Sequence, residues 1–206
     1  VHVSTPRITG ASAFAKRSID VVCSGLGLLL LSPLFALVAL MVKSDKGPVF
    51  FFQERVGIKG QPFKMVKFRS MRTDAEEIKK QLAAQNEGHG LLFKMANDPR
   101  VTPVGRFIRK YSIDELPQLW NVFKGDMSLV GPRPPLPEEV EKYEEMVYRR
   151  LLVKPGITGL WQVSGRSDLS WEESVRLDLY YVENWSLTTD FVILARTVRA
   201  VFAKDG

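Results

Sequence analysis

Hydrophobic and polar positions are most unevenly distributed near the N-terminus of the chain. Residues 21–42 carry no charged side chain, whereas Lys16 and Arg17 precede this segment and Lys43 and Lys46 follow it. A helix of this length would reach roughly 33 Å at 1.5 Å per residue, which is close to the thickness of the hydrocarbon core of a membrane. The pattern therefore predicts membrane contact, through either a single transmembrane helix or a helix that is broken within the bilayer.

Ser32 and Pro33 lie at the middle of this apolar segment and predict such a break. A proline removes one backbone hydrogen bond from a helix and clashes with the carbonyl four residues earlier, so a kink is expected. The Ser32 hydroxyl can bond the freed carbonyl, which needs a partner at membrane depth. Basic residues on both flanks define no inside and outside, and this symmetry suits a hairpin that enters and leaves on one face. The residues alone leave both a single span and re-entry open.

Beyond the apolar segment the pattern predicts one β-hairpin followed by several helices. Segments 48–54 and 63–68 have strand composition, and a turn at 58–62 separates them. Lys67 and Arg69 are expected on one side of the second strand. Apolar spacing and capping signals predict helices over residues 74–86, 101–110, 138–152, 170–184 and 190–202. Together these elements predict an α+β fold that is mostly helical with a small β-hairpin.

Composition narrows the class of partner. The chain has 206 residues, a formal net charge of +6 and a pI near 9.5, so nucleotides, phosphorylated small molecules or anionic lipids are expected to bind. The single cysteine, Cys23, excludes an internal disulfide framework, and His2 and His89 do not supply a metal cage. The cations are scattered over turns rather than gathered on one face with stacking aromatic residues, which argues against nucleic-acid binding. The sequence also lacks a GxxxxGK[ST] phosphate loop, a strand-linked GxGxxG and an HExxH motif.

Most of the residues that could carry chemistry gather within residues 106–134. Asp114 and Glu115 form an adjacent acid pair shortly after Arg109, and Arg133 is held between two prolines. Adjacent carboxylates at a helix start can ligate a hard cation, and one of them can serve as a nucleophile or base. Magnesium is the natural candidate because it binds one or two carboxylates together with the phosphate oxygens of a substrate. Nearby arginines would bind phosphate and stabilise the charge that develops during transfer.

A purely structural role fits the same residues. Residues 112–115 have the spacing of a capping box, and Asp114 alone could be the N-cap of a helix that has Pro117 in its first turn. Arg133 could be a solvated arginine in a tight turn, although its flanking prolines fix its backbone and favour binding. Spacing alone favours capping over catalysis for the acid pair.

Several long motifs, in the order in which they occur, resemble the bacterial sugar transferases, also called monotopic phosphoglycosyl transferases. The resemblance extends from residue 16 to about residue 202. It rests on KRSIDVV at 16–22, the break at Ser32 and Pro33, QERVG at 53–57, KFRSM at 67–71, SIDELPQLWNVFKGDMSLVGPRP at 112–134 and KPGITGLWQVSGR at 154–166.

The resemblance implies transfer of a sugar 1-phosphate from a UDP-sugar to polyprenol (undecaprenyl) phosphate, with release of UMP. This reaction would be the first membrane step of exopolysaccharide, capsule or O-antigen assembly. The resemblance implies that Asp114 is the nucleophile of a covalent phosphosugar-aspartate intermediate and that Glu115 is its acidic partner, both being associated with Mg²⁺. The positions that it links to phosphate or nucleotide binding are Lys67, Arg69, Arg109, Arg133 and Arg166.

The resemblance also implies a monotopic protein of the bacterial inner membrane, with a re-entrant helix and with its catalytic domain on the cytoplasmic face. The expected organisation is a tether over 1–15, a re-entrant helix-hairpin over 16–46 and a catalytic domain over 47–206, with amphipathic helices at the membrane interface. A non-catalytic basic membrane module that binds anionic lipid or nucleotide is the competing interpretation. The sequence identifies no sugar, leaves homo-oligomer formation open, and also leaves open whether the chain is the catalytic part of a longer protein.

Overall fold

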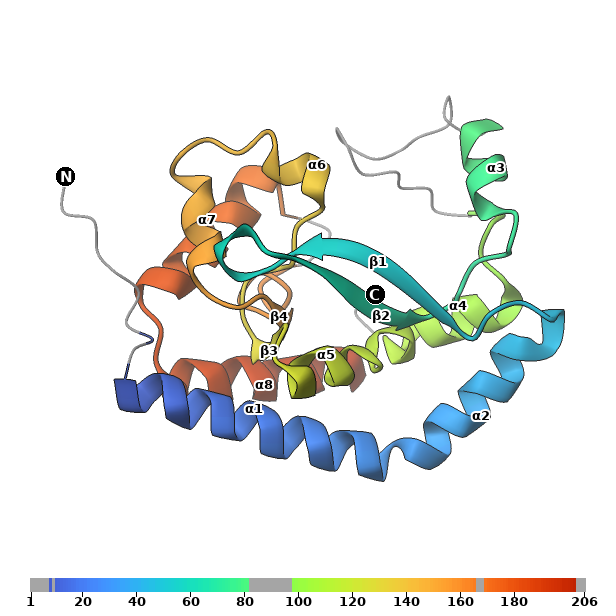
Figure 1. Ribbon diagram of the computed structural model, residues 1–206, viewed down its shortest axis with the longest axis horizontal. Coiled ribbons are helices and arrows are strands. Elements are labelled where there is room, and N and C mark those ends of the chain that lie inside the picture. The colour runs from blue at the N-terminus through green and yellow to red at the C-terminus, as the bar shows by residue number, and fades with distance from the viewer. Residues whose placement is uncertain (1–7, 9, 82–97, 166–168, 203–206) are drawn as a thin grey trace.

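The computed structural model (Figure 1) describes residues 8, 10–81, 98–165 and 169–202. Among these residues helices dominate, and two small two-stranded sheets complete an α+β fold, as the sequence predicts. The α-helices are α1 (Gly10–Leu30), α2 (Ser32–Val42), α3 (Ala75–Gln81), α4 (Pro103–Lys110), α5 (Gln118–Lys124), α6 (Pro137–Val140), α7 (Trp171–Glu183) and α8 (Leu187–Phe202). The strands are β1 (Phe50–Val56), β2 (Pro62–Phe68), β3 (Ser128–Val130) and β4 (Gly156–Thr158), and the 3-10 helices are η1 (Lys43–Asp45), η2 (Ile58–Gly60), η4 (Ile113–Glu115) and η5 (Val147–Leu152).

The apolar N-terminal segment is broken where the sequence predicts it. Helices α1 and α2 meet at an angle of 60°, and the bend is visible at the lower edge of Figure 1. The Ser32 hydroxyl donates to the carbonyl of Leu29 at 2.7 Å, and this carbonyl is the one that Pro33 leaves without its helical donor. Within the described residues no single helix is long and apolar enough to cross a membrane, whereas the bent pair reaches that length and composition together. Helix α1 begins at Gly10, so residues 10–15 are helical and the predicted tether is wrong for them.

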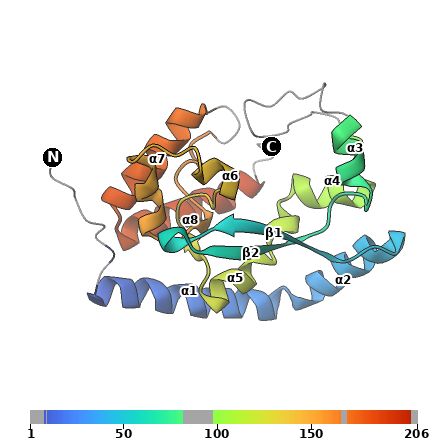
Figure 2. The same ribbon diagram turned by 45° about the horizontal axis from the view of Figure 1, so that its top comes forward.

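The β1–β2 hairpin is confirmed and is fastened to the helix beneath it. Its strands are antiparallel, and it lies over α5 in both ribbon views (Figure 2). The side-chain amide of Asn121 on α5 accepts from the backbone N–H of Val66 at 3.0 Å and donates to the carbonyl of Lys64 at 2.8 Å. Met65 and Val122 are buried between the two elements. The hairpin is thereby fixed over α5, the helix that directly follows the acid pair.

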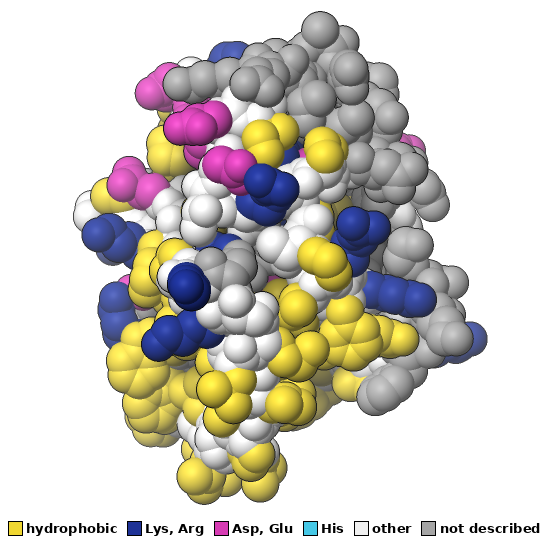
Figure 3. Space-filling model, turned by 90° about the vertical axis from the view of Figure 1, so that its right-hand side faces the viewer, with side chains coloured by type: hydrophobic (Ala, Val, Ile, Leu, Met, Phe, Trp, Pro, Cys, Tyr) yellow, Lys and Arg dark blue, Asp and Glu magenta, His cyan; other side chains and the backbone are white. Residues whose placement is uncertain are grey.

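Helix α5 also packs closely on α1, because two glycines of α1 leave room for its side chains. A Cβ at Gly25 would lie 3.3 Å from the ring of Phe123, and one at Gly27 would lie 3.1 Å from Leu119. The outer surfaces of α1 and α2 remain apolar, with Leu30 and Leu40 each about three-quarters exposed. Figure 3 shows hydrophobic side chains gathered over the lower part of one end of the molecule, below Lys and Arg side chains. The broken helix therefore joins the rest of the fold through one face and leaves an apolar face uncovered.

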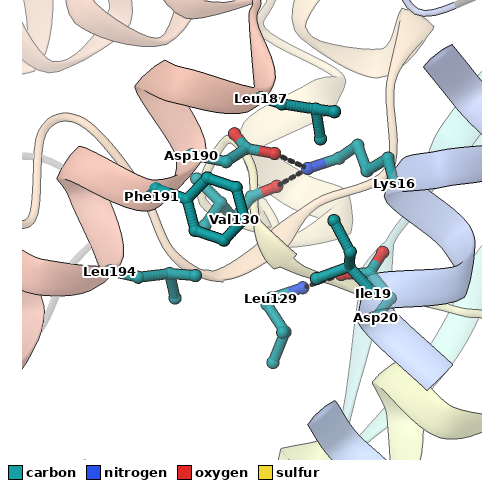
Figure 4. A pocket seen from close by; sticks show the side chains of 9 residues that line it. All are labelled: Lys16, Ile19, Asp20, Leu129, Val130, Leu187, Asp190, Phe191 and Leu194. Carbon is teal, nitrogen blue, oxygen red and sulfur yellow. Dashed lines mark hydrogen bonds and ion pairs between the residues drawn. The ribbon is translucent and has the colours of Figure 1, made fainter. Parts of the chain in front are cut away.

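The two cations before the apolar segment bond to other parts of the fold. Lys16 lies 2.5 Å from the carboxylate of Asp190 on α8 and donates to the carbonyl of Val130 at 3.0 Å (Figure 4). Arg17 donates to the carbonyls of Val122 and Phe123. These carbonyls lie in the last turn of α5, where no backbone N–H of the helix itself is available to them. Both side chains thus tie α1 to the rest of the fold.

Of the helices predicted after the hairpin, one is not formed as expected. Residues 138–152 were expected to be a single amphipathic helix but are divided between the short α6, intervening turns and η5. Arg150 points inward, where it lies 2.5 Å from Asp178 and donates to the hydroxyl of Tyr143 at 2.7 Å. A charged residue of this segment is therefore buried. The segment does not follow the pattern of an amphipathic helix, in which charged side chains face the solvent. The helix predicted from residue 74 is formed as α3 through Gln81, and the rest of that prediction, with His89, lies outside the described residues.

The remaining three helices begin at side-chain caps. Ser170 caps α7 as predicted, accepting from the N–H of Glu173 at 3.2 Å while the Glu173 carboxylate accepts from Ser170 N–H at 2.8 Å. Thr102 accepts from the N–H of Gly105 at 2.8 Å and starts α4. Helix α8 begins at Leu187, a little earlier than predicted, because Ser186 accepts from the N–H of Thr189 at 3.1 Å.

The short parallel sheet holds the Pro-Arg-Pro turn in place. Gly156 at the start of β4 donates to the carbonyl of Pro132 at 2.9 Å. A Cβ at Gly131 would lie 2.4 Å from the carbonyl oxygen of Lys154, and one at Gly156 would lie 2.1 Å from the Gly131 nitrogen. Only glycine permits such an approach of two backbones. The turn that carries Arg133 is consequently anchored from below by β4.

Candidate active site

The acid pair lies in η4, a single 3-10 turn between α4 and α5. Ser112 precedes it with a φ of 54°, in the left-handed region, and its side chain makes no capping hydrogen bond. Helix α5 has Pro117 at its N-cap position, again with no side-chain cap. Neither carboxylate therefore caps a helix, and the capping interpretation of residues 112–115 is wrong. Helix capping therefore occupies neither carboxylate.

Asp114 is the buried member of the pair. It is only 8% exposed. Burial and, after it, the charge of Glu115 raise the pKa of its carboxyl to about 6, against the opposing cations of Lys67 and Arg109. A carboxyl whose pKa lies this close to neutrality is ionised in most molecules at pH 7 and is poorly solvated in that form. Because it is poorly solvated, this carboxylate would be stabilised by a bound cation or by bonding to an electrophile.

Glu115 is the exposed member and is already paired. Its Oε1 lies 2.7 Å from Nζ of Lys67, and its side chain is 41% exposed. Adjacent positions on one turn therefore place one carboxylate in the interior and the other at the surface beside a cation. Two carboxyl groups in contrasting environments are the usual arrangement when one protein uses them for different tasks.

Two of the predicted phosphate-binding cations adjoin the acid pair. Lys67 reaches Glu115 from β2, and Arg109 reaches the site from the last turn of α4. Arg109 donates from Nε to the hydroxyl of Ser70 at 2.8 Å, and its side chain is otherwise exposed. Both cations act electrostatically on Asp114. Lys67 and Arg109 thus lie beside the acids, and their part in phosphate binding stays a prediction.

Arg69 is used differently from Lys67, although the strand pattern grouped the two. It is buried, and its guanidinium donates to the backbone carbonyls of Pro48, Val42 and Met71 at 2.6, 3.0 and 2.9 Å. These bonds fasten the end of α2 to the end of β2, so the side chain has an evident structural task. Its part in phosphate binding stays a prediction, as does that of Arg166, which lies outside the described residues.

Arg133 is paired with a buried acid rather than simply solvated. Its Nη1 donates to both oxygens of Glu139, at 3.2 and 3.0 Å, and the Glu139 side chain is only 4% exposed. Glu139 also accepts from the N–H of Leu136 at 3.1 Å, which fixes the carboxylate in turn. The Arg133 guanidinium is consequently held in one orientation while about a fifth of its side chain stays accessible, at 21%.

Sequence reasoning missed two residues of this site. Arg55 on β1 donates to the carbonyl of Pro134 at 2.9 Å, inside the Pro-Arg-Pro turn. Glu139 orients Arg133. A signal existed for Arg55, since it stands in the QERVG motif with Gln53 and would point to the same side of a strand. Glu139 gave a weaker signal, as one of several acids after a run of prolines.

The donor set around Asp114 suits one kind of metal. Within the described residues no group of three or more His, Cys, Asp or Glu side chains could hold a metal ion. In the part of the chain that the structure describes, Asp114 and Glu115 thus offer a metal two carboxylates and no larger set. Magnesium binds in this manner, through one or two carboxylates with waters and phosphate oxygens completing the octahedron. Zinc, which takes three or four His, Cys or carboxylate ligands, is not matched.

Comparison with known proteins identifies the family. Residues 11–204 match the family described as bacterial sugar transferase. The chain belongs to the bacterial sugar transferase family. It is 49% identical over 193 residues to galactosyl transferase CpsE of Streptococcus agalactiae, covering 93% of this chain and 43% of that protein. The family predicted from the sequence motifs is thereby confirmed.

Two further bacterial sugar transferases have informative names. The chain is 48% identical over 200 residues to the undecaprenyl-phosphate galactose phosphotransferase of Salmonella typhimurium, covering 95% of this chain and 42% of that protein. It is 44% identical over 214 residues to the UDP-galactose-lipid carrier transferase of Erwinia amylovora, covering 100% of this chain and 44% of that protein. The chain thus spans less than half the length of these three relatives.

Proposed function

We propose that this protein transfers a sugar 1-phosphate from a UDP-sugar to polyprenol phosphate, releasing UMP and using Asp114 as the nucleophile. The observation that carries the proposal is the contrast within η4, where Asp114 is buried with a pKa of about 6 and Glu115 is exposed on Lys67. The names of the Salmonella and Erwinia relatives support the two substrates, because they refer to undecaprenyl phosphate and to UDP-galactose. Transfer of this kind would begin the assembly of a surface polysaccharide.

The first step would use the ionised carboxylate of Asp114. One of its oxygens attacks the phosphorus that bears the sugar, an O–P bond forms, and the P–O bond to the UMP oxygen breaks with its electron pair leaving on UMP. The product on the protein is an acyl phosphate between Asp114 and the sugar phosphate. Poor solvation of the buried carboxylate favours this attack, because bond formation disperses its negative charge.

The second step would return Asp114 to its starting state. A phosphate oxygen of the polyprenol phosphate attacks the same phosphorus, and the bond from phosphorus to Asp114 breaks to release the carboxylate. Glu115 stands at the surface beside Asp114, where an incoming acceptor phosphate would arrive, and it can receive a proton from a monoprotonated acceptor. Lys67 and Arg109 would hold the phosphate oxygens during both steps.

Magnesium is the metal that we propose for the pair Asp114 and Glu115. When bound there it would neutralise charge on the substrate phosphates. The support is chemical: two carboxylates on one turn, one of them exposed, suit an ion that takes its remaining ligands from water and phosphate.

We also infer that the protein is monotopic, with α1 and α2 entering the cytoplasmic face of the bacterial inner membrane and returning to it. Their 60° bend and their uncovered apolar side chains support re-entry over a straight span. Ser32 satisfies the carbonyl of Leu29 at the bend, as non-helical backbone at membrane depth requires.

Single cysteines that replace Ala11 and Lys46 in a Cys23→Ser background test re-entry. Both should react with an impermeant thiol reagent from the same side of sealed vesicles, and reaction from opposite sides would refute re-entry.

UMP release tests the reaction itself. The full chain in detergent micelles, supplied with Mg²⁺, polyprenol phosphate and UDP-galactose or UDP-glucose, should release UMP, whereas Asp114→Asn should release none. An Arg176→Met variant on the exposed side of α7 is a matched control for handling and folding. Equal release by the wild type and Asp114→Asn would refute the nucleophile. Nucleotide binding by the wild type without any release would support the non-catalytic membrane module instead.

A further inference from the structure

Arg55 is a buried cation that forms no ion pair with any acid in the described part of the chain. The residue is 8% exposed. Its Nε and Nη2 donate to the side-chain oxygen of Gln53 at 3.2 and 2.8 Å, and its Nη1 donates to the carbonyl of Pro134 at 2.9 Å. All of these acceptors are neutral, and no Asp or Glu among the described residues forms an ion pair with it. A buried charge without a counter-charge costs several kcal/mol, as an order of magnitude, so it indicates an anion that binds there.

A second guanidinium near Arg55 strengthens the argument for a bound anion. Burial and, after it, the cation of Arg133 lower the pKa of Arg55 to about 10, against the opposing charges of Glu139, Glu115 and Glu138. Glu139 is committed to Arg133 through two hydrogen bonds from Nη1. Two guanidiniums therefore share one carboxylate, and an additional anion would relieve their repulsion.

Arg55 and Lys67 lie on the same face of the hairpin, at opposite ends. Phe51 pairs with Lys67 and Arg55 pairs with Phe63 across the two strands. Positions 51 and 55 differ by an even number, so these pairs face the same side and lie about 13 Å apart along the strand. The acid pair adjoins the Lys67 end, and the Pro-Arg-Pro turn adjoins the Arg55 end. On this face Met65 of β2 is buried against α5, so a ligand with two phosphates would follow the β1 half, past the half-buried Gln53, with each end near a cation.

We propose that Arg55, together with Arg133, binds the phosphate that leaves as part of UMP. This inference rests on the proposed transfer reaction, in which Asp114 attacks the sugar-bearing phosphorus. An in-line displacement places the leaving oxygen opposite the attacking one, so the departing phosphate points away from Asp114. Along the hairpin face that direction leads from the Lys67 end to the Arg55 end. Paired arginines there would stabilise the charge that develops on UMP as the P–O bond breaks.

Binding of UMP to the full chain in detergent micelles tests this role. Arg55→Met should weaken UMP binding by at least about tenfold, measured by calorimetry, since a charge-assisted contact to phosphate is lost. Arg55→Lys, which keeps the charge but loses the bidentate fork, should recover part of the affinity. Arg176→Met removes the same charge from an exposed position on α7 and should leave UMP affinity within about twofold. Uridine, which lacks phosphate, should bind all four proteins equally.

The following outcomes would overturn the role of Arg55. Unchanged UMP affinity in Arg55→Met overturns it. Loss of uridine binding along with UMP binding, or a lowered melting temperature in both Arg55 variants, would mean that Arg55 only supports Pro134, and it overturns the proposal as well. The reaction is tested separately: if UMP binding depends on Arg55 but the wild type releases no UMP from UDP-sugars, the transfer reaction fails and the anion site stands. If release requires Asp114 while Arg55→Met binds UMP normally, the anion site alone fails.

Discussion

Replacing Asp114 by asparagine is expected to stabilise the protein at neutral pH while abolishing its activity. The carboxyl is buried in the folded state, whereas it is solvated in the unfolded chain. Asparagine has nearly the same shape and carries no charge. The substitution therefore removes a buried negative charge that the folded protein tolerates only for its chemistry.

The magnitude follows from the pKa of Asp114. Folding raises this pKa from 3.8 to about 6, a change of about two units, which corresponds to about 3 kcal/mol at 1.36 kcal/mol per unit. Between pH 3.8 and about 6 the folded state binds more protons than the unfolded state, so wild-type stability falls as the pH rises through this window. Above pH 7 the ionised Asp114 lowers the stability of the fold by the full amount, and below pH 4 it no longer lowers it.

Thermal unfolding in metal-free buffer with EDTA measures the difference. For a protein of this size about 3 kcal/mol corresponds to roughly 6–12 °C, so Asp114→Asn should melt higher than the wild type by that order at pH 7.5. The difference should vanish near pH 4. Glu115→Gln is the matched control, because its carboxylate is exposed beside Lys67 and its loss should give no gain. A variant that is no more stable than the wild type at pH 7.5, or equally more stable at both pH values, would refute the account of Asp114.

Three further outcomes follow from the structure. UMP release should fall about tenfold per pH unit below pH 6, because protonated Asp114 is no nucleophile, and a flat profile down to pH 5 would contradict this. Lys16→Met should lower stability by about 3 kcal/mol in denaturant unfolding, because it leaves the Asp190 carboxylate buried without its cation, and adding Asp190→Asn should restore part of the loss. Gly131→Ala should lower both the melting temperature and UMP release, since its Cβ would lie 2.4 Å from the Lys154 carbonyl oxygen; a variant with wild-type values would contradict the close approach.

Local chemistry could be predicted from the sequence wherever neighbouring residues decide it. Pro33 breaks the apolar helix and Ser32 bonds the carbonyl of Leu29, as expected from the rules for proline in helices. Ser170 caps α7 for an equally local reason. Prediction failed for residues 138–152, where Arg150 turns inward to a distant acid, Asp178. A buried ion pair between remote segments leaves no periodic signal in either segment.

In the candidate site, too, features that neighbouring residues decide could be predicted, and features that depend on tertiary packing could not. Asp114 and Glu115 stood out by their adjacency, but spacing alone favoured a capping role that the structure does not support. Their contrast in burial depends on how α5 and the hairpin pack, which local sequence does not determine. Arg55 was overlooked because its demand for an anion becomes evident only when its neutral neighbours are known. Arg133 was expected to be available, and its bond to Glu139 could be found only in three dimensions.

The covalent intermediate is the central claim, and intact-mass spectrometry tests it most directly. The full chain is incubated with Mg²⁺ and a UDP-sugar in the absence of polyprenol phosphate, quenched in acid and weighed. The mass should rise by that of one sugar phosphate, the modified peptide should contain Asp114, and subsequent addition of polyprenol phosphate should remove the adduct. Turnover by a wild-type protein that never carries this adduct, or an adduct that persists in Asp114→Asn, would contradict the proposed mechanism.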